Sequence, residues 1–347
     1  MKSKEVQYRY QVQEVIGSGS HGRILAAENQ EAHESVAIKT QRQHHSILQK
    51  EAKIYKKLLG APGFPVCKQL ISEKGTESLV MELLGHNLSQ LLREAGSGHF
   101  SLKTTLMIAD QMLIRLQYLH TKGYVHCDIK PENIVVGKLL KANQFFLIDM
   151  GLATRYINKK SGEHVSFSDK CNFNGTPKYA SCNAHRGLRL SRRDDLESLG
   201  YTLIYLLTGS LPWATFSNSK DIMYCKMNTS VKYLCDGLPE EFEIFMNSVK
   251  CLGFSDEPDY NHYREIFRKL FIRRKFIYDY AFDWSKSLIA KSYTTTGTIG
   301  NSILFDDKSI NKNVIANTVI DKNCPHNLCK KAPNNITRKH RLLIYPS

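Results

Sequence analysis

Short runs of β-branched and aromatic residues alternate with polar breaks from residue 9 to residue 83. This alternation predicts a small antiparallel sheet, which one helical stretch at residues 46–59 interrupts. From Leu88 onward the period changes to that of an amphipathic helix. The positions on the inner face of that helix recur at spacings of four and three, and they are Leu102, Leu106, Ala109, Leu113, Leu116 and His120.

Further helices are expected at residues 193–207, 240–251 and 259–272. A β-rich segment followed by a helical one predicts an α+β fold built as two lobes. The expected limits are a small β-rich N-lobe at about 9–83, a hinge at 82–85 and a larger helical C-lobe at about 86–285.

The last part of the chain, residues 286–347, is rich in Asn, Lys, Thr and Ser and has no sustained period, which predicts a low-complexity, disordered tail. Its two cysteines, Cys324 and Cys329, resemble half a metal site at best, because no second pair at useful spacing exists. The nine cysteines of the chain are scattered and odd in number, which is typical of reduced thiols in a cytosolic or nuclear protein. The polar N-terminus lacks the apolar core of a secretory signal, and the longest apolar stretches are too short to span a bilayer.

The formal net charge of the chain is +15. Such a charge fits either a solvated basic surface or attraction to acidic partners, such as phosphorylated or Asp/Glu-rich proteins. Nucleic acid is disfavoured as a partner, because no zinc finger, RRM signature or basic zipper accompanies the charge. We therefore expect a monomer that binds acidic or phosphorylated protein substrates.

A glycine-rich run, Gly17-Ser18-Gly19-Ser20-His21-Gly22, follows a strand-like segment. Glycine lets the backbone approach phosphates closely, where a Cβ atom would collide. The strand-like run Val36-Ala37-Ile38-Lys39 comes next, and its terminal lysine is placed to hold α- and β-phosphates. Glu51 is a better partner for Lys39 than Glu34, because Glu51 begins a helical run.

The most specific motif is His126-Cys127-Asp128-Ile129-Lys130-Pro131-Glu132-Asn133. In this pattern Asp128 suits the acceptance of a proton from an attacking hydroxyl, and Lys130 can neutralise charge on a transferring phosphoryl group. Asn133 and Asp149 are candidate Mg²⁺ ligands, since Asp149 follows a buried-strand pattern and precedes Gly151. Asp195 is expected to be a buried acceptor for the amides of this motif.

In this order the motifs resemble those of protein kinases, which implies transfer of the γ-phosphoryl group of Mg-ATP to a hydroxyl. The resemblance places the adenine against the hinge backbone, with Met81 at the back of its pocket. The residues implied for ATP are Ile16, Gly17, Ser18, Gly19, Ser20, His21, Gly22, Arg23, Ile24, Ala37, Lys39, Met81, Glu82, Leu83, Leu84 and Val135.

Several stretches resemble the casein kinase I family specifically, over about residues 9–285. They are Leu79–Gly85, His120–His126, Gly175-Thr176-Pro177-Lys178-Tyr179-Ala180-Ser181, Ser191–Gly200, Leu211–Trp213 and Phe282–Trp284. Where other kinases carry Ala-Pro-Glu, this chain has Ser181-Cys182-Asn183, which is similar to the Ser-Ile-Asn of that family. The resemblance implies a serine/threonine kinase that prefers acidic or already phosphorylated substrates, with Thr176 and Lys178 at the substrate.

Two positions depart from the family pattern. Cys127 replaces the arginine that pairs with an activation-segment phosphate, so we expect activity without phosphorylation of that segment. The loop after Trp213 is short, and its basic run is reduced to Lys220 and Lys226. Recognition of a phosphorylated residue upstream of the target is therefore expected to be weaker than in the family.

The competing function is a scaffold or pseudokinase that keeps the fold without the chemistry. Loss of Lys39, Asp128, Asn133 or Asp149 would favour it, and the sequence retains all four. A nucleic-acid-binding protein is a third possibility, and it predicts RNA or DNA affinity that falls steeply with salt.

Overall fold

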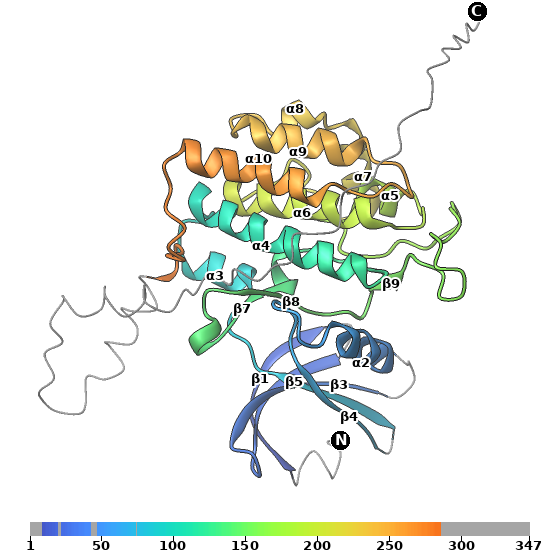
Figure 1. The fold of residues 1–347 in the computed structure, drawn as a ribbon, viewed down its shortest axis with the longest axis vertical. Helices are drawn as coiled ribbons and strands as arrows, with labels where there is room; N and C mark the ends of the chain where they lie inside the picture. The colour runs from blue at the N-terminus through green and yellow to red at the C-terminus, as the bar shows by residue number, and fades with distance from the viewer. Residues whose placement is uncertain (1–8, 20–21, 43–46, 74, 286–347) are drawn as a thin grey trace, which may run out of the picture. The chain divides into compact units, whose positions relative to one another are not determined.

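The computed structural model describes residues 9–19, 22–42, 47–73 and 75–285 (Figure 1). The predicted tail with its two cysteines lies outside these residues, as do Ser20 and His21 of the glycine-rich run.

A five-stranded antiparallel sheet with the strand order β1-β2-β3-β5-β4 forms the N-terminal region. One helix, α2 (Ile47–Leu58), contacts β4 and β5 through an apolar face (Figure 1). This arrangement confirms the predicted sheet and its single helix. The strands are β1 (Tyr10–Gly19), β2 (Gly22–Asn29), β3 (Glu34–Arg42), β4 (Cys67–Glu73) and β5 (Thr76–Glu82).

The region after β5 is mainly helical, which confirms the predicted α+β class. Its helices are α3 (Leu88–Glu94), α4 (Leu102–Thr121), α5 (Cys182–His185), α6 (Arg192–Thr208), α7 (Ser219–Asn228), α8 (Val231–Leu234), α9 (Glu240–Lys250) and α10 (Tyr260–Arg273). Its short strands are β6 (Tyr124–Val125), β7 (Ile134–Val136), β8 (Phe145–Leu147) and β9 (Thr154–Arg155), with 3₁₀ turns at Pro131–Asn133 and Leu139–Lys141. The helices expected from periodicity are α4, α6, α9 and α10, and the last three begin and end within one residue of their predicted limits.

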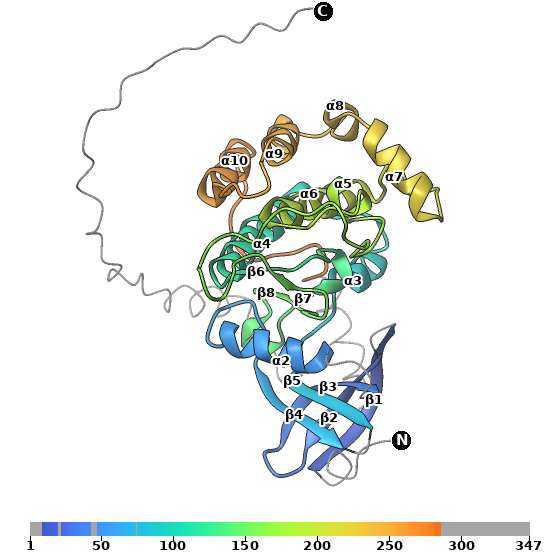
Figure 2. The ribbon, with the colours of Figure 1, turned by 90° about the vertical axis from the view of Figure 1, so that its right-hand side faces the viewer.

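Helix α4 differs from its prediction in one respect. The inner-face positions are buried except for the partly buried Leu102, but residues on other faces, including Met107, Ile108 and Arg115, are buried as well. The reason is that α6, α10 and β8 pack around α4 and leave it little solvent-facing surface (Figure 2). A helix surrounded by neighbours buries more than one stripe.

The chain segment after α10 returns to the start of α4. Asp283 accepts hydrogen bonds from the backbone N–H of Ser101 at 2.6 Å and from its hydroxyl at 2.7 Å. Phe282 and Trp284 stack at 4.9 Å between ring centroids, and both lie against Phe145 of β8. The segment therefore forms part of the core that packs against β8.

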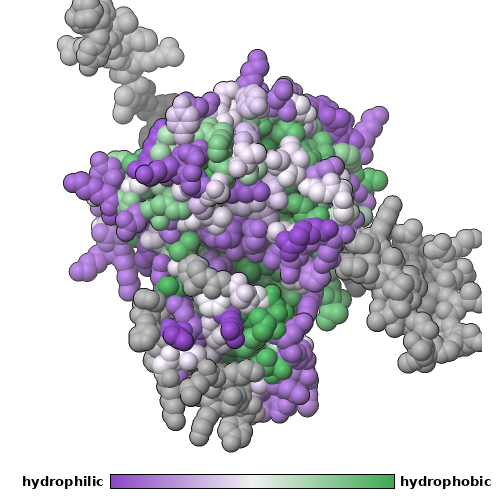
Figure 3. All heavy atoms as spheres, turned by 180° about the vertical axis from the view of Figure 1, so that it is seen from behind, coloured by the Kyte–Doolittle hydropathy of each residue, from purple (hydrophilic) through white to green (hydrophobic). Residues whose placement is uncertain are grey.

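Polar residues cover much of the face seen in Figure 3, with smaller apolar areas between them. In the described part of the chain, no helix has the length and apolar character needed to cross a membrane. The seven cysteines in that part are free thiols.

Candidate active site

The glycine-rich run forms the turn between β1 and β2, where Gly19 pairs with Gly22. Gly22 has φ = +110°, and a Cβ atom there would lie 2.0 Å from the carbonyl oxygen of Thr40. A side chain would therefore be strained and would collide with the backbone of β3. Gly22 is therefore needed for the close approach of β2 to β3, and the role of the run at phosphates stays a prediction. Residues 17–19 and 22 of the run are described.

The apolar residues that the resemblance implies for the adenine lie on five strands. Ala37 of β3 lies directly opposite Met81 of β5, and both are buried, as is Val135 of β7. Ile16 is partly exposed on β1, and Ile24 is half-buried on β2. Their role as walls of a nucleotide pocket stays a prediction.

The predicted hinge begins at Glu82, the last residue of β5, and its residues 83–85 have no regular structure. The backbone N–H of Gly85 donates to the carbonyl oxygen of Val136 at 2.8 Å, and Val136 in turn donates to His86 at 3.0 Å. These bonds fasten the predicted hinge to β7, the strand that carries Val135.

Lys39, on β3 of the sheet, forms ion pairs with a residue of α2 and with a residue that follows β8. Its Nζ atom lies 2.9 Å from Glu51 Oε2 and 2.8 Å from Asp149 Oδ1. Burial alone would lower the pKa of Lys39, but the two carboxylates outweigh it and raise that pKa above its usual value. The amine is therefore a permanent cation, and the prediction of Glu51 as its partner is confirmed. Glu34 instead pairs with Lys68 at 2.7 Å on the surface.

One face of α2 holds the backbone around Asp149. Glu51 Oε1 accepts the N–H of Met150 at 3.2 Å, and the hydroxyl of Tyr55 accepts the N–H of Asp149 at 3.0 Å. Glu51 and Tyr55 are four residues apart, so they lie on the same helical face. Tyr55 was in the helical run recognised in the sequence, but its contact to Asp149 depends on the tertiary fold.

A second cluster surrounds Asp128. The hydroxyl of Thr176 donates to Asp128 Oδ1 at 2.7 Å, and Lys130 Nζ lies 2.7 Å from Asp128 Oδ2 and 2.8 Å from Thr176 Oγ1. Asn133 Nδ2 donates to the backbone oxygen of Asp128 at 2.8 Å and to Oδ2 at 3.1 Å. Three of the predicted catalytic residues and one predicted substrate residue are therefore in direct contact.

Two oxygen donors fit a divalent metal. The backbone N–H of Ile148 donates to the carbonyl oxygen of Asn133 at 3.0 Å, which brings Asn133 beside Asp149. Asp149 Oδ1 binds Lys39 and the N–H of Gly151, whereas Oδ2 has no partner among the described residues. Burial opposes ionisation of Asp149, but Lys39 outweighs burial and lowers its pKa to about 2.

Mg²⁺ is usually held by one or two protein oxygens together with water and phosphate oxygens. An ionised carboxylate and a neighbouring side-chain amide match that requirement. The described residues contain no group of three or more His, Cys, Asp or Glu side chains that would make a metal site by themselves.

Asp195 of α6 holds the backbone of the Asp128 motif through hydrogen bonds. Its carboxylate accepts the N–H of His126 at 2.7 Å and of Cys127 at 2.8 Å, which confirms the predicted role. His120 Nε2 lies 2.8 Å from the same carboxylate. Burial opposes ionisation of Asp195, but the hydrogen bond to His120 prevails and lowers its pKa. Cys127 has φ = +69°, an uncommon conformation for a residue with a side chain, and these bonds hold it there.

The side chain of Cys127 is buried among Val125, Tyr156, Ala180 and Leu190. Burial raises the pKa of its thiol well above the usual value. The position at which the resemblance implies an arginine is therefore neutral and apolar.

Lys178, which the resemblance implies at the substrate, and Lys226 differ in their environments. Lys178 is half-buried, and its Nζ atom lies 3.6 Å from the ring centroid of Tyr205. Lys226, one of the two basic residues that the sequence retains after Trp213, is not on the surface. Lys226 lies in α7 and is only 1% exposed, because it and Ile222 form the buried face of that helix.

Residues 10–255 match the model of the protein kinase domain. The match covers more than half of the chain, so the chain belongs to the protein kinase domain family. Membership implies a phosphotransferase that uses ATP and a divalent metal and acts on proteins. The paired Lys39 and Glu51 agree with an intact catalytic lysine.

The position of Met81 leads to a prediction about the nucleotide pocket. Met81→Gly should admit ATP analogues with a bulky group on the adenine, because the side chain that closes the back of the pocket is removed. Transfer of labelled phosphate from such an analogue measures this effect, with Met81→Leu as a control that keeps the volume. Equal use of the analogue by wild type and Met81→Gly would show that the adenine lies elsewhere.

Proposed function

We propose that this protein is a Mg-ATP-dependent serine/threonine kinase of the casein kinase I type, acting on acidic or already phosphorylated proteins. The observation that carries the proposal is the contact of Lys130 and Thr176 with the two carboxylate oxygens of Asp128. This contact supports a site arranged around a small aliphatic hydroxyl, since the threonine hydroxyl already donates to the carboxylate that would receive the substrate hydroxyl.

In the proposed mechanism each residue has a separate task. Asp128 orients the substrate hydroxyl and accepts its proton, while Lys130 offsets charge on the transferring phosphoryl group. Lys39, kept cationic and directed by Glu51, binds the α- and β-phosphates of ATP. Mg²⁺, held by Asn133 and Asp149, would neutralise charge on the β- and γ-phosphates. Catalysis would then come from positioning and electrostatics.

The preference for acidic substrates is supported by charge. The chain has a net charge of +15, and Lys178 places a half-exposed cation two residues beyond Thr176. A positive surface near the site raises the local concentration of acidic peptides. The buried, neutral Cys127 supports activity without a phosphate on the activation segment, because no cation stands there to bind one.

The alternative is a catalytically weak kinase-fold scaffold. Against it stands the geometry of the four residues that the chemistry needs, since Lys39 contacts Asp149 and Asn133 contacts Asp128. A scaffold has no need to keep these contacts.

Phosphate transfer from labelled Mg-ATP to casein, to an acidic serine peptide and to matched neutral and tyrosine peptides tests the proposal. We expect transfer to casein and the acidic serine peptide, little transfer to tyrosine, and nearly full activity after phosphatase treatment. Lys178→Glu should lower the preference for acidic over neutral peptide by a few-fold, because it reverses a charge beside the substrate. Lys269→Glu makes the same charge change at an exposed position of α10 and serves as the control.

Absence of transfer to every acidic substrate would favour the scaffold. Activity that vanishes on dephosphorylation would refute the expected independence from activation-segment phosphate.

A further inference from the structure

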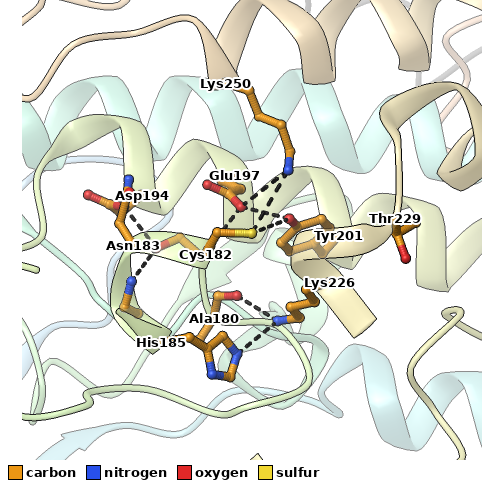
Figure 4. A network of polar contacts seen from close by, with 12 residues as sticks. Ala180, Cys182, Asn183, His185, Asp194, Glu197, Tyr201, Lys226, Thr229 and Lys250 are labelled. Atoms are coloured by element: carbon orange, nitrogen blue, oxygen red, sulfur yellow. Dashed lines mark hydrogen bonds and ion pairs between the residues drawn. The ribbon is translucent and has the colours of Figure 1, made fainter. Parts of the chain in front are cut away.

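Lys226 is a buried lysine whose main partners are backbone carbonyls. Its Nζ atom donates to the carbonyl oxygen of Pro177 at 2.7 Å and of Ala180 at 2.6 Å, and it lies 3.4 Å from His185 Nε2 (Figure 4). Within the described ranges, no carboxylate lies at ion-pair distance from Lys226. Lysine is almost never fully buried without a carboxylate partner, so these carbonyls indicate what the amine does.

The segment that Lys226 contacts, residues 177–180, continues directly from Thr176. A third carbonyl of this segment, that of Lys178, accepts the indole N–H of Trp213 at 2.8 Å. The carbonyls of residues 177, 178 and 180 are therefore all bound by side chains from the region of α6 and α7. Because Thr176 contacts Asp128, residues 177–180 begin beside the catalytic carboxylate.

The surroundings of Lys226 support an amine that donates hydrogen bonds. The ring centroids of Tyr201 and Trp213 lie 4.9 Å and 5.0 Å from its Nζ atom, and aromatic faces attract cations. Burial lowers the pKa of Lys226 to about 7. Burial, together with Lys226, lowers the pKa of His185 to about 4, so that imidazole is neutral at pH 7. Both the ammonium and the neutral amine carry N–H groups for the two carbonyls.

His185 Nε2 also lies 3.1 Å from the carbonyl oxygen of Pro177, but this imidazole is neutral at pH 7. The charged groups of the cluster other than Lys226 do not contact residues 177–180. Glu197 accepts the N–H of Cys182 at 3.0 Å and the hydroxyl of Tyr201 at 2.6 Å. Lys250, from α9, lies 3.9 Å from both Glu197 and the sulfur of Cys182 (Figure 4). Lys226 is thus the cation of the cluster that bonds to residues 177–180.

We propose that Lys226 is a positioning residue that holds residues 177–180 in the place where the protein substrate binds beside Asp128. The inference rests on the proposed kinase function. A peptide whose hydroxyl reaches Asp128 must continue along this segment, because the segment starts at the threonine that contacts Asp128. Lys226 therefore acts on affinity for the protein substrate without touching it.

Steady-state kinetics of Lys226→Met test the proposal. Methionine keeps the length and the apolar stem of lysine but donates nothing to the two carbonyls. The KM for the acidic serine peptide should rise on the order of tenfold, as expected when hydrogen bonds to buried carbonyls are lost. The kcat and the KM for ATP should stay within about twofold of wild type, because Lys226 contacts neither the nucleotide residues nor Asp128.

Lys250→Met is the matched control, since it removes a cation from the same cluster without touching residues 177–180. Its peptide KM should equal that of wild type. A merely structural role for Lys226 would lower the active fraction and leave both KM values unchanged, and this result would overturn the proposal. An equal rise of the peptide KM in Lys226→Met and Lys250→Met would overturn it as well.

If Lys226→Met does not fold, Lys226→Gln tests the positioning role of Lys226 instead. Glutamine keeps N–H donors on a shorter side chain, so its peptide KM should lie between those of wild type and the expected methionine value. A peptide KM equal to that of wild type would count against the need for an amine that reaches both carbonyls.

Hydrogen exchange separates this inference from the proposed function, because it needs no activity. The N–H groups of Tyr179 and Ala180 both donate to the carbonyl oxygen of Thr176 at 2.9 Å. These amides should exchange faster in the folded Lys226 variants than in wild type and Lys250→Met. Unchanged exchange would overturn the inference even in an active enzyme. If wild type transfers no phosphate while the exchange difference appears, the proposed function fails and the holding role of Lys226 remains.

Discussion

Asp128→Asn is expected to lower the turnover of phosphoryl transfer by at least about 10²-fold. The substitution removes the negative charge and one acceptor oxygen from a group that Thr176, Lys130 and Asn133 all contact. An amide cannot accept the proton of the substrate hydroxyl, so the loss should fall on kcat. Initial rates at saturating ATP and peptide measure it.

Asp236→Asn is the control for this substitution. Asp236 is exposed after α8, and its side chain is remote from the Asp128 cluster, but the change in net charge is the same. The turnover of Asp236→Asn should equal that of wild type. Equal turnover of Asp128→Asn and wild type would remove Asp128 from the mechanism and favour the scaffold.

The second large effect is expected from Lys39→Met, which should lower activity by at least on the order of 10²-fold, because it removes a donor to the phosphates of ATP. It should also lower the free energy of unfolding by about 3–5 kcal/mol, since Glu51 becomes an uncompensated charge in a fully buried site. Phosphate transfer and urea denaturation measure the two effects.

The double variant Lys39→Met with Glu51→Gln separates the two effects. Replacing the carboxylate with a neutral amide should restore part of the lost stability while activity stays absent. Lys68→Met is the surface control, because its partner Glu34 is largely exposed and such a pair contributes at most about 1 kcal/mol. Lys39→Met that keeps wild-type activity would contradict the assigned role of Lys39 at the phosphates.

Local sequence signals predicted the residues that meet at the active site. Lys39, Glu51 and Asp149 are far apart in sequence, but each sits at the end of an apolar strand or on a helix whose period is clear. The motif order therefore carried enough information to place the two clusters.

The environment of Lys226 could not be predicted in the same way. Its helix, α7, buries only Ile222 and Lys226, so its apolar period is too weak to distinguish it from a loop. A lysine is expected on the surface unless its partners are known, and here they are carbonyls whose positions depend on the tertiary fold. The packing of α4 on several sides was missed for a similar reason, because periodicity reports one buried face and not the number of neighbours.

Two hydrogen bonds couple the position of α2 to the position of the segment after β8. Met150 is fully buried, and its N–H bonds to Glu51 while the N–H of Asp149 bonds to Tyr55. A compound that binds only when Met150 leaves the core must break both bonds. Its binding therefore favours displacement of α2, and displacement of α2 favours its binding by the same free energy. Selectivity for such a compound would then be set by the strength of two hydrogen bonds on one helical face rather than by the shape of the adenine pocket.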